Sequence, residues 1–179
     1  MVNQPLPYKE LPTPPKQYFP GAIVARMLDG LGFRYYWATE GLREEDLLYR
    51  PTAAAWSTHN LLGHILALTK ITLGTLEDNF DAKKYIRVEL LPFEQLRFNT
   101  LHSIEKTSKL LLKTNDLDQF KTVFSGKGGQ EITYPFWNQL NGPIADALWH
   151  VGQLVSYRRT SGNPIPGGIN FFSGTVKKY

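Results

Sequence analysis

The sequence predicts an all-α domain: a four-helix bundle with a small β-hairpin before its last helix. Apolar residues recur every three or four residues in four separate segments, which is the spacing of an amphipathic helix. Two short β-prone runs lie between the third and fourth of these segments. A chain of 179 residues is long enough to bury a single core of this kind without disulfides.

Residues 1–19 are rich in proline, and we expect them to form an extended arm that lies over the body or reaches a partner. The helical bundle is expected to span residues 20–166, with a C-terminal tail over 167–179. The first helix begins at Gly21 and ends near Gly41. Its apolar residues are Ile23, Val24, Met27, Leu28, Leu31 and Tyr35.

The second helix begins after Ser57, whose hydroxyl suits an N-cap, and runs to about Glu77. A long connection follows over residues 79–92. The third helix then runs from Phe93 to near Asn115.

The runs FKTVF and QEITY flank the glycine-rich stretch SGKGG and predict a β-hairpin over residues 120–134. Pro143 stands directly before the last helix, and Gly162 and Pro164 follow its end. Because loops near a site commonly contact substrate, we expect the hairpin and the tail to border the mouth of a site on the last helix.

The composition narrows the classes of function. The chain has no cysteine, so a metal site must use His, Asp or Glu. The sequence has no long uncharged apolar run, so we expect a soluble protein without a membrane span. The net charge is +4, but Lys and Arg are scattered among Asp and Glu, so we expect no nucleic-acid partner. Prolines replace the apolar run of a signal peptide at the N-terminus, which predicts a cytoplasmic protein.

His64 is the first candidate for chemistry, because it falls within the apolar arc of the second helix, formed by Leu61, Ile65, Leu68 and Ile71. A buried imidazole must satisfy two ring nitrogens. Metal coordination would satisfy them, and so would a hydrogen bond to a backbone carbonyl in the core.

Asp146 and His150 are the second candidate, since four residues are about one helical turn and both side chains then project from one side. The alternative is a hydrogen-bonded pair on the surface. Gln153 and Tyr157 cluster with them, opposite an apolar stripe formed by Ile144, Leu148, Val151 and Val155.

The last helix is therefore either solvated on its polar side or covered on both sides. Trp149 favours covering, because a free surface seldom needs an indole. One side would face the bundle or a partner subunit, and the other would face the groove that holds His64. The surplus apolar surface predicts a homodimer.

Four motifs resemble the DinB-like metal-binding four-helix-bundle superfamily. They are W-S at 56–57, G-H at 63–64, D-x-x-x-H-V-G-Q at 146–153 and R-R-x-x-G-N-P at 158–164. The resemblance covers residues 21–166. It implies a divalent metal ion held by one histidine of the second helix and a pair on the last helix, which by position are His64, Asp146 and His150. The chain departs from the family at Asp146, where histidine is usual, and at Asn60, where glutamate is usual.

Three protein ligands leave positions open for water or substrate, which is typical of a catalytic site. The metal could be Zn, Ni, Fe or Mn, and would lower the pKa of a bound water or thiol. Members of the superfamily include S-transferases that use low-molecular-weight thiols, so the resemblance implies a thiol S-transferase or a hydrolase acting on a small molecule. Gln153 and Tyr157 would orient a ligand or the substrate, and the alternative is that each is a polar residue of the surface.

Two alternatives to this enzyme stay open. The chain could be a non-catalytic, stress-associated metal-binding dimer, in which the polar cluster only stabilises the fold. Two histidines and one carboxylate also occur in non-haem iron oxygenases, although normally on another fold. His59 lies about 140° around the helix from His64, so we expect it, like His102 on the third helix, to be a surface or cap residue.

Overall fold

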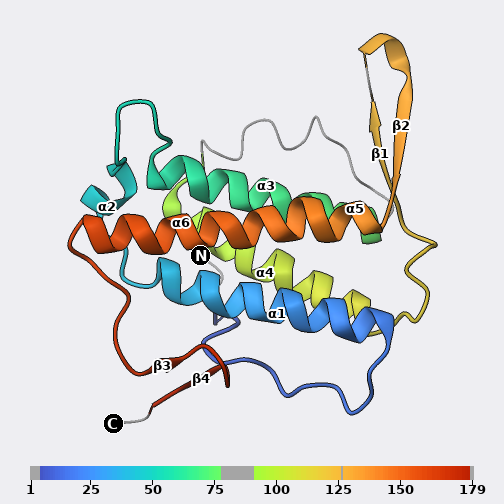
Figure 1. The fold of residues 1–179 in the computed structure, drawn as a ribbon, viewed down its shortest axis with the longest axis horizontal. Coiled ribbons are helices and arrows are strands. Elements are labelled where there is room, and N and C mark those ends of the chain that lie inside the picture. The colour runs from blue at the N-terminus through green and yellow to red at the C-terminus, as the bar shows by residue number, and fades with distance from the viewer. Residues whose placement is uncertain (1–4, 78–90, 126, 178–179) are drawn as a thin grey trace.

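The computed structural model describes residues 5–77, 91–125 and 127–177. Within these ranges the chain is mostly helical with a small antiparallel β-hairpin, as the sequence predicts. Four long helices run side by side, joined by shorter elements (Figure 1). They are α1 (Pro20–Thr39), α3 (Thr58–Leu76), α4 (Phe93–Leu111) and α6 (Ala145–Thr160).

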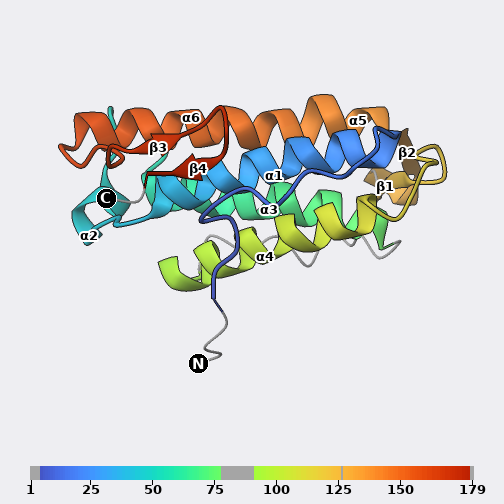
Figure 2. The same ribbon diagram turned by 90° about the horizontal axis from the view of Figure 1, so that it is seen from below.

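The long helices enclose one apolar core. Helices α1 and α3 each pack against both α4 and α6, and Figure 2 shows α1 and α3 lying between α6 and α4. Burial of each leucine-sized side chain contributes roughly 1.5–3 kcal/mol to stability. The largest fully buried side chains are Leu31, Phe33, Tyr35, Leu61, Leu62, Ile65, Leu66, Leu96, Leu101, Ile104, Leu111 and Ile144.

Helix α1 begins at Pro20, a residue favoured in the first turn because its fixed φ suits a helix. Two members of its predicted apolar stripe are not in the core: Ile23 is 52% exposed and Met27 is 44% exposed. Both side chains instead line a surface hollow beside the proline-rich arm. The smaller Ala22 and Ala25 take the buried positions and allow the neighbouring helices to approach.

Helix α3 begins where the sequence predicts, because the Ser57 hydroxyl accepts a hydrogen bond from the Asn60 backbone N at 3.2 Å. The connection predicted over residues 79–92 lies almost entirely outside the described residues. Helix α4 ends at Leu111, earlier than predicted, since the chain turns at Thr114: its hydroxyl accepts from the Asp116 backbone N at 3.3 Å.

The predicted hairpin is confirmed by the pairing of β1 (Lys121–Ser125) with β2 (Glu131–Pro135). The turn passes through the short helix η3 (Lys127–Gly129), where Gly128 and Gly129 have φ of 78° and 81°. Left-handed backbone of this kind favours glycine. Two further elements were not predicted: the helix α2 (Glu44–Leu48), and a short pair of strands in the tail, β3 (Ile169–Asn170) with β4 (Thr175–Val176).

The last long helix, α6, begins at Ala145, just after Pro143, as the sequence predicts, but further helical structure that the sequence did not predict precedes it. Helical structure begins before Pro143, with α5 (Trp137–Gln139), and continues through a π-helical turn, η4 (Leu140–Ile144), into α6. Gly142 breaks the regular backbone inside this turn, with φ −95° and ψ −107°. The break and the wider turn accommodate a proline that has no N–H to donate and that would clash in a regular helix.

Two buried charged residues close one end of the molecule. Arg158 is 3% exposed and donates to the backbone oxygens of Trp37 at 3.1 Å, Ala38 at 3.3 Å and Glu40 at 2.7 Å. It thereby satisfies carbonyl groups at the end of α1 that have no partner within the helix.

Asp46 on α2 is 1% exposed and accepts hydrogen bonds from Arg43, Ser161 and Asn163. The bonds from Arg43 above all, followed by those from the other two residues, hold the pKa of the Asp46 carboxyl well below its usual range. The R-R-x-x-G-N-P motif therefore fastens α2 and the end of α1 to the end of α6.

The N-terminal arm lies over the body. The Tyr8 side chain is buried, and its hydroxyl donates to Asp29 Oδ1 at 3.0 Å; Ser108 Oγ donates to the same oxygen at 2.7 Å. Burial, as the largest effect, raises the pKa of Asp29. The Tyr8 ring packs directly on Gly32, where a Cβ would lie 2.5 Å from a ring carbon.

Gly32→Ala is therefore expected to release the arm and to lower the free energy of unfolding by about 1–3 kcal/mol, the usual cost of overpacking. Trypsin should then cleave at Lys9 and Lys16 faster than in the wild type. Gly30→Ala is the matched control, because a Cβ there would meet only the flexible end of Arg34, at 3.4 Å. Equal cleavage of the two variants would contradict this account of the arm.

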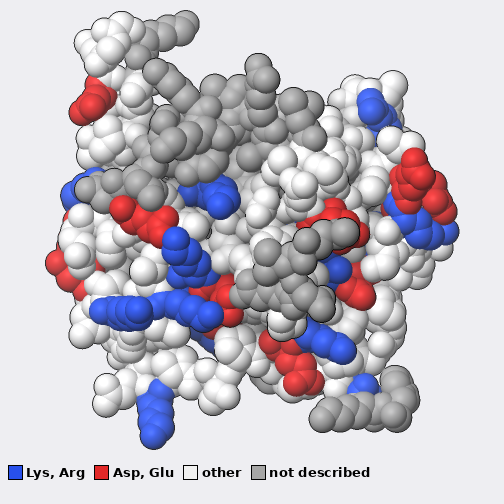
Figure 3. Space-filling model, turned by 180° about the vertical axis from the view of Figure 1, so that it is seen from behind, with Lys and Arg blue, Asp and Glu red and all other residues white. Residues whose placement is uncertain are grey.

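The charged side chains are mixed by sign on the face seen from behind, where Lys and Arg lie among Asp and Glu (Figure 3). On α4, Lys109 pairs with Glu105 at 2.6 Å, and Lys106 pairs with Glu77, the residue that follows α3. Among the described helices, none is both long enough and apolar enough to cross a membrane.

Candidate metal centre

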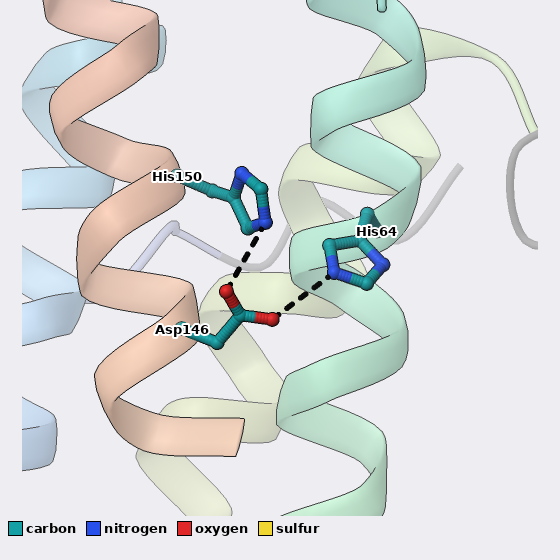
Figure 4. A group of neighbouring side chains, drawn as sticks. All are labelled: His64, Asp146 and His150. Atoms are coloured by element: carbon teal, nitrogen blue, oxygen red, sulfur yellow. Dashed lines mark hydrogen bonds and ion pairs between the residues drawn. The ribbon is translucent and has the colours of Figure 1, made fainter. Parts of the chain in front are cut away.

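Three side chains of ligand type converge between α3 and α6. His64 comes from α3, while Asp146 and His150 come from adjacent turns of α6, and all three point toward one another (Figure 4). Their ligand atoms lie within 4.8 Å of one another. Among the residues that the structure describes, no other group of three His, Asp or Glu side chains comes together in this way.

The helices place these side chains at the edge of the core. Leu61 and Ile65 beside His64 are 2% and 0% exposed, and Ala147 and Val151 beside the α6 residues are likewise buried. This packing fixes both backbones. The side chains of His64, Asp146 and His150 are 32%, 42% and 15% exposed. The group thus lies on the packed core on one side and is open to solvent on the other.

Asp146 links the two histidines. Its Oδ2 lies 3.3 Å from His64 Nε2, and its Oδ1 lies 3.3 Å from His150 Nε2. The two imidazole rings are nearly perpendicular, at 88°, with centroids 4.8 Å apart. Each ring therefore directs one nitrogen toward a shared carboxylate.

Gln153 determines which nitrogen of His150 carries the proton. Its Oε1 lies 2.6 Å from His150 Nδ1, and because an amide oxygen only accepts, this hydrogen bond assigns the proton to Nδ1. A neutral His150 then presents the Nε2 lone pair to the carboxylate, so two acceptors face each other at 3.3 Å. A metal ion between these two acceptors would be compatible with this contact. The group fits a metal ion, since imidazole and carboxylate are common ligands.

Trp56 is a residue of this site to which the sequence analysis gave no role. Its ring lies at 69° to His64, with centroids 5.2 Å apart, and is nearly parallel to His150, at 23° and 6.1 Å. It is half exposed. Trp56 precedes the N-cap of α3, so helical periodicity does not predict where its side chain points. The W-S motif was the only feature of the sequence that indicated Trp56.

The remaining candidates lie around or away from the group. Tyr157 packs edge to face on Tyr49, at 5.6 Å between centroids, and a role for it at the site stays a prediction. His59 Nε2 is 3.0 Å from the Leu91 backbone oxygen, and His102 lies against Phe98. Both are outside the group, but the expectation of a surface or cap residue was wrong for His102, whose side chain is 19% exposed with its Nε2 buried.

The expectation that the hairpin and the tail border this site was wrong. Pro164 and Phe171 of the tail share a hollow with Leu148 and Val151, on the opposite side of α6 from His150. The hairpin extends from the far end of the molecule (Figure 1), where it joins the last turn of α3. The hairpin and the tail flank the last helix in sequence, but this did not predict that they lie near the site. The chain runs in a different direction from each end of this helix, and neither direction leads to the site.

Comparison of the chain with protein-family models, with curated proteins and with solved structures finds no match.

Proposed function

We propose that this chain is a DinB-like four-helix bundle and a metal-dependent enzyme that acts on a small molecule, with a low-molecular-weight thiol as one substrate. The observation that supports this most directly is the convergence of His64, Asp146 and His150 at the seam between two helices, with one side open to solvent. A purely structural metal site would be expected to be closed by a fourth protein ligand.

The architecture supports the same proposal. Helices α1, α3, α4 and α6 pack around a common core, each against two of the others. The candidate ligands occupy the second and fourth of these long helices, in the order that the DinB-like motifs have. In bundles of this type, metal sites are built from side chains on facing helices.

Two imidazoles and one carboxylate suit a first-row divalent ion, and we propose Zn, Ni, Fe or Mn. Such an ion, when bound, supplies Lewis-acid activation that lowers the pKa of a thiol or a water molecule. Gln153 holds the His150 ring in the orientation that exposes Nε2 to the site. Asp146 lies between both rings and adds a negative charge, and Trp56 forms an apolar wall beside them.

The reaction we favour is S-transfer: a thiol loses its proton, and its sulfur displaces a leaving group from the second substrate. Hydrolysis, in which water takes the place of the thiol, is the alternative for the same site. We further propose that the chain forms a homodimer, because Trp149 on α6 is 68% exposed in the single chain.

The test is to strip the protein with a chelator and reload it separately with Zn, Ni, Fe and Mn. Each form is then assayed with low-molecular-weight thiols and chlorodinitrobenzene as the electrophile, and with nitrophenyl acetate for hydrolysis. We expect turnover in a reloaded form, proportional to its metal content, and none in the stripped protein. One equivalent of bound metal without turnover in any form would favour the non-catalytic metal-binding dimer.

A further inference from the structure

A second hollow lies on the opposite side of α6 from the candidate metal centre. It occupies about 580 Å³ between α6, α1 and the C-terminal tail, within the usual range for small-molecule sites. Figure 2 shows β3 and β4 of the tail beside α6 and α1. The residues that matter for its chemistry are Arg34, Leu148, Val155, Arg159, Ile165 and Phe171.

The charges of this groove are all of one sign. Arg34 and Arg159 line it, and no Asp or Glu is found among the described lining residues. Arg34 is held both by its own helix and by the tail: its Nη1 donates to the Gly30 backbone oxygen of α1 at 3.0 Å, and its Cζ lies 5.9 Å from the centre of the Phe171 ring of the tail. Arg159 is exposed and forms no ion pair with any part of the chain that the structure describes.

The remainder of the groove is an open apolar surface. Leu148 and Val155 are only half-buried on the α6 side, and Phe171 is 37% exposed on the tail side. Gly152 lies between them, and a Cβ there would meet nothing within 4 Å. The chain therefore leaves room for an apolar body next to two guanidinium groups.

We propose that this groove binds an amphipathic organic anion. An aromatic or short acyl body lies on Leu148, Val155 and Phe171, and a carboxylate or sulfonate head lies between Arg34 and Arg159. Guanidinium groups form strong, often paired hydrogen bonds to planar anions of this kind. The site is independent of the metal centre and of the function proposed for it.

Charge complementarity argues against a second copy of this chain as the occupant. A symmetric dimer contact pairs a surface with itself. Such a contact here would bring Arg34 and Arg159 of one protomer against the same two residues of the other. Like charges at close range oppose that arrangement, whereas an anion neutralises it.

The probe is anilinonaphthalene sulfonate, which has an aromatic body and one anionic group and fluoresces in apolar surroundings. Its neutral counterpart is phenylnaphthylamine, which keeps the body and lacks the sulfonate. We expect the sulfonate to bind with a stoichiometry of one, and to be displaced by octanoate but not by octanol at the same concentration.

Arg159→Gln is the decisive variant, because Arg159 makes no ion pair that the fold depends on. We expect it to weaken sulfonate binding about tenfold, as the loss of one charge-assisted hydrogen bond predicts, and to leave the neutral probe unaffected. Arg50→Gln is the matched control: it removes the same charge from an exposed position outside the groove. Val155→Asp, which adds a carboxylate to the groove, should abolish sulfonate binding.

Three results would overturn the proposal. The first is equal sulfonate affinity in the Arg159→Gln and Arg50→Gln variants. The second is an equal loss of the neutral probe in Arg159→Gln, which would indicate a change of shape rather than a lost charge. The third is a change of Val155→Asp from dimer to monomer in light scattering, which would make the groove an interface between copies of the chain.

Discussion

Replacing His64 or His150 by alanine is expected to abolish tight metal binding while leaving a folded, helical protein. Each histidine directs one nitrogen at the shared Asp146 carboxylate, so each change removes one of the three candidate ligands. Loss of an outer hydrogen-bond partner alone typically costs about 10–100-fold in metal affinity, and loss of a ligand should cost more. The fold should persist because the buried neighbours Leu61, Ile65 and Val151 are untouched.

Metal content is measured by elemental analysis after chelator treatment and reloading, and helicity by circular dichroism. His102→Ala is the matched control, since His102 is a helical histidine outside the group. Asp146→His should retain the metal and shift the preference among metals, because it replaces a carboxylate with a neutral, softer donor. If both alanine variants retain as much metal as the wild type, the three residues are a hydrogen-bonded group and the proposed enzyme has no centre.

Arg158→Met should lower the free energy of unfolding by about 3–5 kcal/mol, the largest stability effect we expect for a single side chain. The variant keeps an apolar stem but leaves the backbone oxygens of Trp37, Ala38 and Glu40 without their donor. Each unsatisfied buried polar group costs about 1–3 kcal/mol.

Urea denaturation measures this loss, and the next residue supplies the control. Arg159 is exposed, so Arg159→Met should change stability by no more than about 0.5 kcal/mol. Similar losses in the two variants would show that net charge, rather than the buried hydrogen bonds, accounts for the effect.

Local chemistry made much of the fold predictable. The Ser57 cap, the glycines of the hairpin turn and the apolar periodicity of α3 act within a few residues, and the structure agrees with each. The helical structure before Pro143 was missed, because a proline is read as a boundary and the π-helical turn that accommodates it depends on the packing around it. Helix α2 was missed because five residues are too few for a periodic pattern.

Periodicity predicted the candidate site one helix at a time, and only the motif resemblance led us to expect the contact between the two helices. Periodicity placed His64 toward the interior and placed Asp146 and His150 on one side of the last helix. It could not say that these two surfaces meet, because 82 residues separate His64 from Asp146. The position of the Trp56 ring could not be predicted for another reason. Trp56 precedes the N-cap of α3, so helical periodicity does not apply to it.

The π-helical turn η4 lets one continuous helix serve two different surroundings. Gln139 and Asp146 are seven residues apart and would share a side of a regular helix. Yet Gln139 is 2% exposed and donates to Thr122 Oγ1 at 2.6 Å, whereas the Asp146 side chain is 42% exposed at the open site. The turn thus changes the direction in which side chains point around the helix axis. Gln139 before the turn faces the hairpin, and Asp146 after it faces α3. We therefore expect a one-residue insertion or deletion between 140 and 144 to rotate α5 and the hairpin relative to α6, while His64 and His150, which lie outside this segment, keep their positions.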